Sequence, residues 1–157
     1  MGGVAGPQAR MARGGEGAAN VLLRAEPMAV RGALQELVCQ LETLPLDPEE
    51  LGTVELVVAE ALNNIVEHAY GGQRAGDVRL YWTAGATGLH LRITDDGSPM
   101  PDGRLPVGGT PGTWDHLSLV PEGGFGWFLI SGLARNIVYR RDRGQNVLTF
   151  RLAVGIR

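Results

Sequence analysis

Three polar residues recur at four-residue spacing in the segment Glu60-Ala-Leu-Asn-Asn-Ile-Val-Glu-His-Ala-Tyr70. Glu60, Asn64 and His68 would share one face of a helix, each about 6 Å further along its axis, and that face lies away from the apolar stripe of the same helix. A carboxylate can accept a proton, and a neutral amide oxygen is a suitable ligand for Mg²⁺. The same spacing is also typical of a solvated helix face, so taken alone it leaves both interpretations open.

Two further segments could contact a nucleotide. Ile93-Thr-Asp95-Asp96-Gly97 places a carboxylate and a glycine at a strand end, where Asp95 could accept a hydrogen bond from the amine of a base. Gly123-Gly124-Phe-Gly126 opens a predicted helix, and the free N–H groups of a helix N-terminus bind anions. Taken singly, the first segment is also an ordinary strand-to-turn signal, and the second is a weak glycine pattern.

The rest of the chain predicts the elements that would position these segments. Residues 21–24 are expected to form an edge strand. Glu26-Pro27 opens a helix that runs to about Leu44, and Asp47-Pro48 caps a second helix that runs to about Tyr70. Alternating apolar residues then predict two hairpins, one from the strands around 78–83 and 89–94 and one from those at 137–141 and 147–152. A short helix over 125–134 lies between the hairpins.

This order of elements predicts an α+β fold, a two-layer sandwich with helices on one face of a mostly antiparallel mixed sheet. Residues 97–126 are rich in Gly and Pro and lack a sustained period, which indicates a lid over a site. Residues 1–19 are interpreted as a disordered tail and residues 20–157 as a single domain, because 157 residues amount to about one domain.

Composition narrows the function classes. Hydrophobic residues make up 44% of the chain and charged residues 20%, which indicates a globular protein. The net charge of −3 and the absence of a Lys/Arg run argue against direct nucleic-acid binding. No apolar run has the length of a membrane span or a signal-peptide core, so we expect a cytoplasmic protein that does not bind membranes. The single cysteine, Cys39, excludes an internal disulfide and is expected in the core beside Leu37, Val38 and Leu41.

The order and spacing of the three segments resemble the gyrase–chaperone–histidine-kinase superfamily of ATPases, over roughly residues 21–152. Glu60-x-x-x-Asn64 is similar to its N box, Asp95-x-Gly97 to its adenine-binding box, and Gly124-x-Gly126 to its second glycine box. Within the superfamily, Glu60-Ala-x-x-Asn64 followed by His68-x-Tyr70, together with Gly-Gly-x-Gly-x-Phe-Leu-Ile, resembles the anti-sigma-factor serine kinases. The fold implied is the Bergerat-type ATP-binding fold.

The resemblance implies ATP and Mg²⁺ as cofactors. Asn64 would ligate the Mg²⁺ that bridges the phosphates, and Glu60 would orient or deprotonate the attacking hydroxyl. Asp95 would bond the amino group of adenine, and Gly97 would let the backbone approach the base. Pro99 departs from the family's frequent pattern, which has glycine at that position.

The remaining site residues follow from the same resemblance. Gly124 and Gly126 would let the lid wrap the phosphates, and Arg104 is the cation that the lid could lend. His68 matches a family position near the helix end, and its role stays open. The segment between Gly97 and Gly126 contains no lysine. This weakens the case for fast phosphoryl transfer from ATP more than the case for nucleotide binding.

The function implied is an anti-sigma factor that is also a serine/threonine kinase. It would sequester a sigma factor and phosphorylate an anti-sigma-factor antagonist protein, a partner switch in which a homodimer is also allowed. The alternative is an ATP-binding module that sequesters its partner with little or no kinase activity. A more distant alternative, an ATPase fragment of the chaperone or topoisomerase type, would need further domains. The intact Glu60 favours the kinase.

Overall fold

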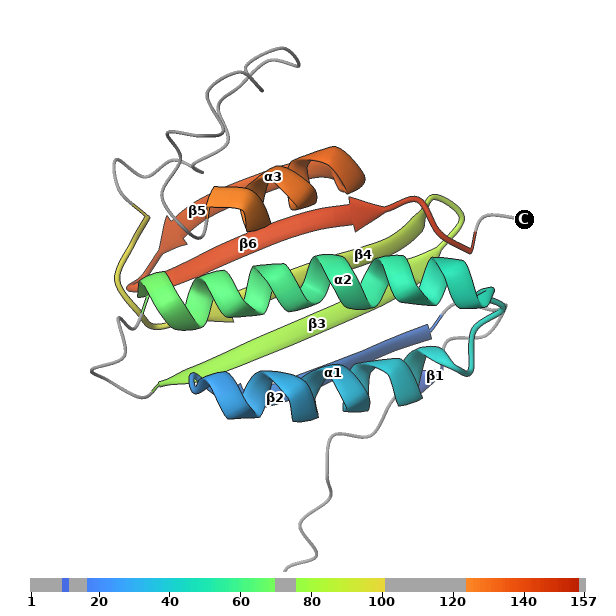
Figure 1. Cartoon of the computed structure of the whole chain (residues 1–157), viewed down its shortest axis with the longest axis horizontal. Coiled ribbons are helices and arrows are strands. Elements are labelled where there is room, and N and C mark those ends of the chain that lie inside the picture. The colour runs from blue at the N-terminus through green and yellow to red at the C-terminus, as the bar shows by residue number, and fades with distance from the viewer. Residues whose placement is uncertain (1–9, 12–16, 70–75, 101–123, 156–157) are drawn as a thin grey trace, which may run out of the picture.

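One sheet with helices on one side makes up the fold in the computed structural model (Figure 1), which describes residues 10–11, 17–69, 76–100 and 124–155. The chain order of the predicted elements, from the first helix to the last hairpin, is confirmed. The elements are β1 (Arg10–Met11), β2 (Gly17–Arg24), α1 (Pro27–Leu41), α2 (Pro48–Asn64), the π-helix η1 (Ile65–Ala69), β3 (Asp77–Gly85), β4 (Gly88–Asp95), α3 (Gly124–Leu133), β5 (Arg135–Asp142) and β6 (Gln145–Leu152).

The sheet has the strand order β1-β2-β3-β4-β6-β5. Every pairing between the described strands is antiparallel, so the parallel pairing that a mixed sheet would contain is not found among them. The strand predicted at the edge, β2, lies between β1 and β3 and already begins at Gly17. Strands β1 and β2 therefore include residues that were expected in a disordered tail. The sequence did not indicate these strands because strand pairing leaves little signature in a Gly- and Ala-rich segment.

Local sequence explains where α1 and α2 begin. Pro27 occupies the first turn of α1, where its missing N–H costs no helical hydrogen bond. Asp47 caps α2: its side chain accepts a hydrogen bond from the Glu50 N–H, and the Glu50 carboxylate accepts one from the Asp47 N–H. This reciprocal pair is the capping box, and it fixes the start of the helix on which the N-box residues lie.

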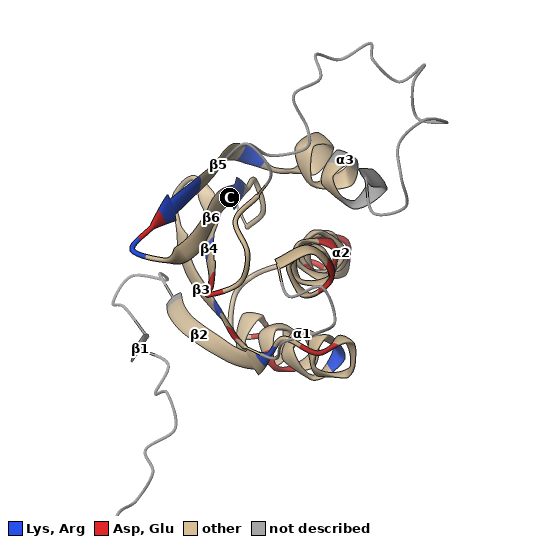
Figure 2. Ribbon diagram, turned by 90° about the vertical axis from the view of Figure 1, so that its left-hand side faces the viewer, with Lys and Arg blue, Asp and Glu red and all other residues tan. Residues whose placement is uncertain are grey.

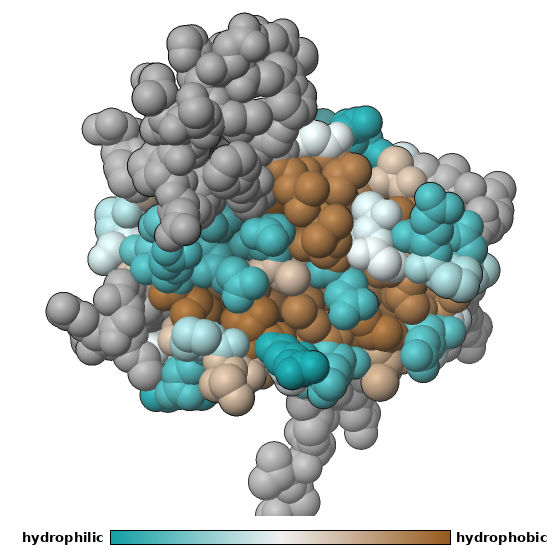
Figure 3. Space-filling model, viewed as in Figure 1, coloured by the Kyte–Doolittle hydropathy of each residue, from teal (hydrophilic) through white to brown (hydrophobic). Residues whose placement is uncertain are grey.

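The core lies between the sheet and the helices. All three helices cover the same face of the sheet, with α2 between α1 and α3 (Figures 1 and 2). Leu37 of α1, Leu62 of α2 and Ile130 of α3 are fully buried against inward-facing strand residues such as Leu80 and Ile93. On the helical side, hydrophobic atoms reach the surface over α3 and between α1 and α2 (Figure 3). Among the described residues, no helix is both long and apolar enough to cross a membrane.

Two sequence predictions about α1 are wrong in detail. Cys39, expected in the core, is exposed. It follows the buried Leu37 by two residues, which is about 200° around a helix, so it points away from the buried stripe. The helix also ends at Leu41 and not near Leu44. By Leu44 the chain has left the helix in a turn, in which the Leu44 N–H donates to the Leu41 carbonyl.

Candidate functional site

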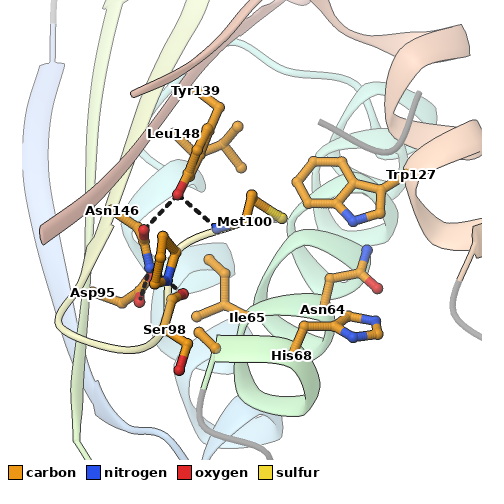
Figure 4. Close-up of a pocket in the computed structure, with 12 residues that line it drawn as sticks. Asn64, Ile65, His68, Asp95, Ser98, Met100, Trp127, Tyr139, Asn146 and Leu148 are labelled. Carbon is orange, nitrogen blue, oxygen red and sulfur yellow. Dashed lines mark hydrogen bonds between the residues drawn. The ribbon is translucent and has the colours of Figure 1, made fainter. Parts of the chain in front are cut away.

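A cavity of about 280 Å³ lies where the C-terminal end of α2, the end of β4 and the start of α3 meet. Its walls are polar on two opposite sides and apolar between them, as Figure 4 shows. Asp95 and Asn146 stand on one side, with Asn64 and Trp127 on the other. The residues that line it are Asn64, Ile65, His68, Ala69, Asp95, Ser98, Pro99, Met100, Trp127, Tyr139, Asn146 and Leu148.

Asp95 is the buried acid of this cavity, with 3% of its surface exposed. Its Oδ1 accepts hydrogen bonds from the Gly97 N–H at 2.9 Å and from Asn146 Nδ2 at 2.8 Å. No hydrogen bond from the described residues reaches Oδ2, which leaves that oxygen to accept one from a ligand. Burial raises the pKa of Asp95 above its ordinary value, although these two hydrogen bonds and the charge of Arg141 oppose the rise.

Asn146 holds this side of the cavity in place. It lies directly opposite Asp95 in the β4–β6 register. Besides its bond to Asp95, its Nδ2 donates to the Ser98 carbonyl at 2.9 Å, and its Oδ1 accepts from the Tyr139 hydroxyl at 2.6 Å. The same hydroxyl accepts the Met100 N–H at 2.8 Å (Figure 4). The chain after Asp95 is therefore tied to both strands of the last hairpin.

The opposite side of the cavity carries two buried N–H donors that have no hydrogen-bond partner among the described residues. They are Asn64 Nδ2 and Trp127 Nε1, on side chains that are 3% and 2% exposed. Buried donors almost always have a partner, and leaving one unpaired costs about 1–3 kcal/mol. Two such donors lining one cavity indicate that a ligand accepts their hydrogen bonds.

Burial corrects one expectation about α2. The helix face with Glu60, Asn64 and His68 was expected to lie away from the buried stripe, yet Asn64 is buried, Glu60 is half-buried and only His68 is exposed. The reason is that α3 packs against α2 beside the sheet, so a wider arc of α2 is covered than one stripe would give. Asn64 and His68 line the cavity, whereas Glu60 lies one turn earlier and is not among the lining residues.

The glycines of the predicted boxes have different positions. Gly97 packs directly on the helix end: a Cβ at Gly97 would lie 2.6 Å from the Ala69 carbonyl oxygen, and the neighbouring Ser98 N–H donates to that same oxygen at 2.7 Å. Gly124 is the first residue of α3, and Gly126 lies in its first turn. Arg104 and most of the predicted lid over residues 97–126, namely residues 101–123, lie outside the described residues.

Sequence reasoning missed three residues of this site, namely Trp127, Tyr139 and Asn146. A signal for Asn146 was present, since it precedes Leu148, Phe150 and Leu152 at period two, and a polar residue in an inward-facing series is unusual. Trp127 directly follows the glycine pair in the first turn of α3. Nothing in the sequence pattern places Tyr139, because its role depends on the register of β5 against β6.

Comparison with known proteins agrees with this architecture. The family described as histidine kinase-like ATPase domain matches residues 23–152, most of the chain. Curated relatives include the serine-protein kinase RsbW of Listeria monocytogenes serovar 1/2a and that of Listeria innocua serovar 6a, each 26% identical over 101 residues. Each match covers 64% of this chain and 64% of the relative, so slightly less than two thirds of the relatives' length is matched. An ATPase domain of this kind binds ATP. Because the family match extends over most of the chain, the chain belongs to the histidine kinase-like ATPase domains.

Proposed function

We propose that this protein is an ATP-dependent serine/threonine kinase that also sequesters a sigma factor. The observation that carries the proposal is the cavity with a buried carboxylate on one side and two unpartnered N–H donors on the other. A carboxylate suits the amino group of a base, and free donors suit phosphate oxygens. The two sides of the cavity therefore complement the two ends of a nucleotide.

On the base side, Asp95 accepts a hydrogen bond from the amino group of adenine. Its Oδ1 is occupied by Gly97 and Asn146, so Oδ2 is the oxygen that remains for the ligand. Ile65 and Leu148 supply apolar walls for the ring. The pairing of Asn146 with both Asp95 and the backbone after it sets the carboxylate in one orientation before any ligand arrives, which lowers the entropic cost of binding.

On the phosphate side, Asn64 offers its amide oxygen to Mg²⁺, and bound Mg²⁺ would neutralise part of the phosphate charge. No three His, Cys, Asp or Glu side chains gather as metal ligands in the part of the chain that the structure describes. Phosphate oxygens and water would complete the coordination, as is usual for Mg²⁺. Trp127 lies in the first turn of α3, where the helix N-terminus favours anions, and its Nε1–H donates to a phosphate oxygen.

For transfer, we assign the role of base to Glu60. It lies one turn before Asn64 on α2 and is half-buried, so it can approach a substrate hydroxyl at the rim without taking part in the wall. Bound ATP supplies the phosphoryl group. Glu60 orients the serine or threonine hydroxyl of the substrate protein and accepts its proton as the hydroxyl oxygen attacks the γ-phosphorus. The bond between the γ-phosphorus and the ADP oxygen breaks, and ADP leaves. Gly124 and Gly126 allow the chain before α3 to approach the phosphates closely, while Arg104 and His68 are secondary candidates for phosphate contacts.

The similarity to serine-protein kinase RsbW supports the kinase activity. The partners follow from the resemblance of the N-box and glycine-box segments to the anti-sigma-factor serine kinases. We assign a sigma factor as the sequestered partner and an anti-sigma-factor antagonist as the phosphorylated one, in a cytoplasmic partner switch. The test is transfer of labelled phosphate from ATP to candidate antagonist proteins encoded near this chain's gene. Label on one antagonist, on serine or threonine, is the expected result.

The alternative is a sequestering module that binds ATP without transferring phosphate. The half-exposed position of Glu60 outside the described cavity wall is the observation in its favour. Wild-type protein that binds Mg·ATP and a sigma factor, yet labels none of the antagonists overnight, would establish this alternative over the kinase.

A further inference from the structure

The face of the sheet opposite the described helices carries six arginines on the described strands: Arg24 on β2, which pairs with Asp77, and five others. The five others are Arg79 on β3, Arg92 on β4, Arg151 on β6, and Arg135 and Arg140 on β5. On β3, β4 and β6 they alternate with residues that face the core, and on β5 they lie opposite outward-facing residues of β6, so all five point away from the core. Four of the five are exposed and Arg151 is half-buried. We call this surface the basic face.

Within the described part of the molecule, two acids on the same face, Asp77 and Asp142, offset only part of the positive charge of the basic face. The one ion pair found there joins Arg24 and Asp77, at 3.6 Å, and includes none of the other five arginines. Arg135 lies directly opposite Arg151, and Arg151 lies directly opposite His90 on β4. Like charges at directly opposed positions, such as those of Arg135 and Arg151, destabilise a sheet, so this pair favours an anionic occupant.

The same face is hollowed and partly apolar. A depression of about 510 Å³ is lined in part by Tyr81, His90, Arg92 and Arg151. The Arg92 guanidinium lies 4.6 Å from the ring centre of Tyr81, and Arg151 is fixed by a 3.0 Å bond to the Thr87 carbonyl. Both cations are thus held in position before a ligand arrives. Beside the depression, Leu22 and Val138 are 57% and 52% exposed.

We propose that the basic face binds an acidic segment of a partner protein. Arginine and tyrosine are enriched in protein interfaces, and the exposed Leu22 and Val138 add apolar contact area. All 14 basic residues of the chain are arginine, whose planar guanidinium pairs with carboxylates through two parallel hydrogen bonds. This inference goes beyond the nucleotide site, which lies on the other face of the sheet.

Charge distribution favours a short acidic peptide over nucleic acid or a second copy. Among the described residues, the acidic ones concentrate on the helices and most of the basic ones on the sheet, as the ribbon colours of Figure 2 show, and the net charge of the chain is −3. A long polyanion would extend past the basic face and be repelled by the acidic side, whereas a short segment contacts the arginines alone. A twofold pairing of this face with itself would set arginine against arginine.

Binding of a fluorescein-labelled deca-glutamate peptide to the full chain, followed by anisotropy, tests the proposal. We expect saturable binding that weakens as salt rises. Arg92→Glu should weaken it about tenfold or more, since it removes one attraction and adds one repulsion. The control is Arg31→Glu, at an exposed position on α1. It makes the same change in net charge and should alter the affinity less than twofold.

Three results would overturn the proposal. Equal losses in the Arg92 and Arg31 variants would show that net charge alone attracts the peptide. Tighter, Arg92-dependent binding of a uridine decamer would assign the face to nucleic acid. Concentration-dependent dimerisation that Arg92→Glu abolishes would assign it to a second copy. If Arg92→Glu does not fold, Arg140→Glu replaces it, because the Arg140 side chain is exposed and makes no hydrogen bond to the other described residues.

Discussion

The unpartnered indole N–H of Trp127 gives the most direct test of the nucleotide site. Trp127→Phe keeps an aromatic ring in the cavity wall and removes the one donor of the side chain. A hydrogen bond to a charged acceptor contributes about 1.5–3 kcal/mol, so the dissociation constant for ATP should rise about 10- to 150-fold. The smaller ring also loosens packing, but that loss affects free and bound protein alike.

The chain contains a matched control for this substitution. Trp82 is also buried, but its Nε1–H already donates to the Gln40 side-chain oxygen at 2.7 Å, away from the cavity. Trp82→Phe should therefore lower the melting temperature, because it leaves the Gln40 oxygen without this donor, yet leave the ATP affinity within about twofold of wild type. The contrast between the two variants separates a ligand contact from general loss of an indole.

Titration calorimetry with ATP, ADP and adenosine is the assay. The affinity loss of the Trp127 variant should be present for ATP and ADP and absent for adenosine, because adenosine carries no phosphate. The assignment would be refuted if the Trp127 variant bound ATP with wild-type affinity, or if its affinity for adenosine fell as much as its affinity for ATP. Wild-type protein that binds none of the three ligands would instead contradict the proposed function itself.

Three other substitutions test the remaining roles. Asn64→Ala should abolish the Mg²⁺-dependent part of ATP binding, and calorimetry showing an unchanged Mg²⁺ dependence would contradict it. Asp95→Asn should weaken ATP binding about 10- to 100-fold, since an amide nitrogen would replace an acceptor. It should also raise the melting temperature at neutral pH, because the raised pKa means that ionised Asp95 costs stability; that gain should shrink as pH falls through the raised pKa toward 3.8. Glu60→Gln should slow phosphotransfer by about 10²–10⁴-fold with unchanged ATP affinity; Glu55→Gln, exposed on the same helix, is the control, and equal rates in both variants would rule out a base at position 60.

Local sequence patterns predicted many of the helices and strands. Asp47 and Pro48 predicted the start of α2, and the capping box with Glu50 confirms it. The alternation of Leu89, Leu91 and Ile93 predicted β4, and it pairs with β3 as expected. Such features succeed because their physical cause lies within a few residues of the chain.

Features that depend on contacts distant in sequence were not predictable in the same way. Asn146 contacts Asp95 only because β6 pairs with β4 in one particular register. Asn64 is buried because α3, far along the chain, covers that side of α2. Cys39 was misplaced for a simpler reason, since three apolar neighbours in sequence do not make a shared helix face.

The close approach of Gly97 to the end of η1 limits which residues of the site can change during evolution. Any side chain at position 97 would meet the backbone carbonyl of Ala69, and replacing Ala69 by glycine would leave that carbonyl where it is. No second side-chain substitution can compensate, so the glycine is required by the packing of this fold whether or not a nucleotide binds. A descendant that lost ATP binding would be expected to keep Gly97, whereas Asp95 could change to a residue such as asparagine, whose side-chain oxygen still accepts the hydrogen bonds of Gly97 and Asn146. In related sequences, the acid is therefore the better marker of retained nucleotide binding, and the glycine marks the fold.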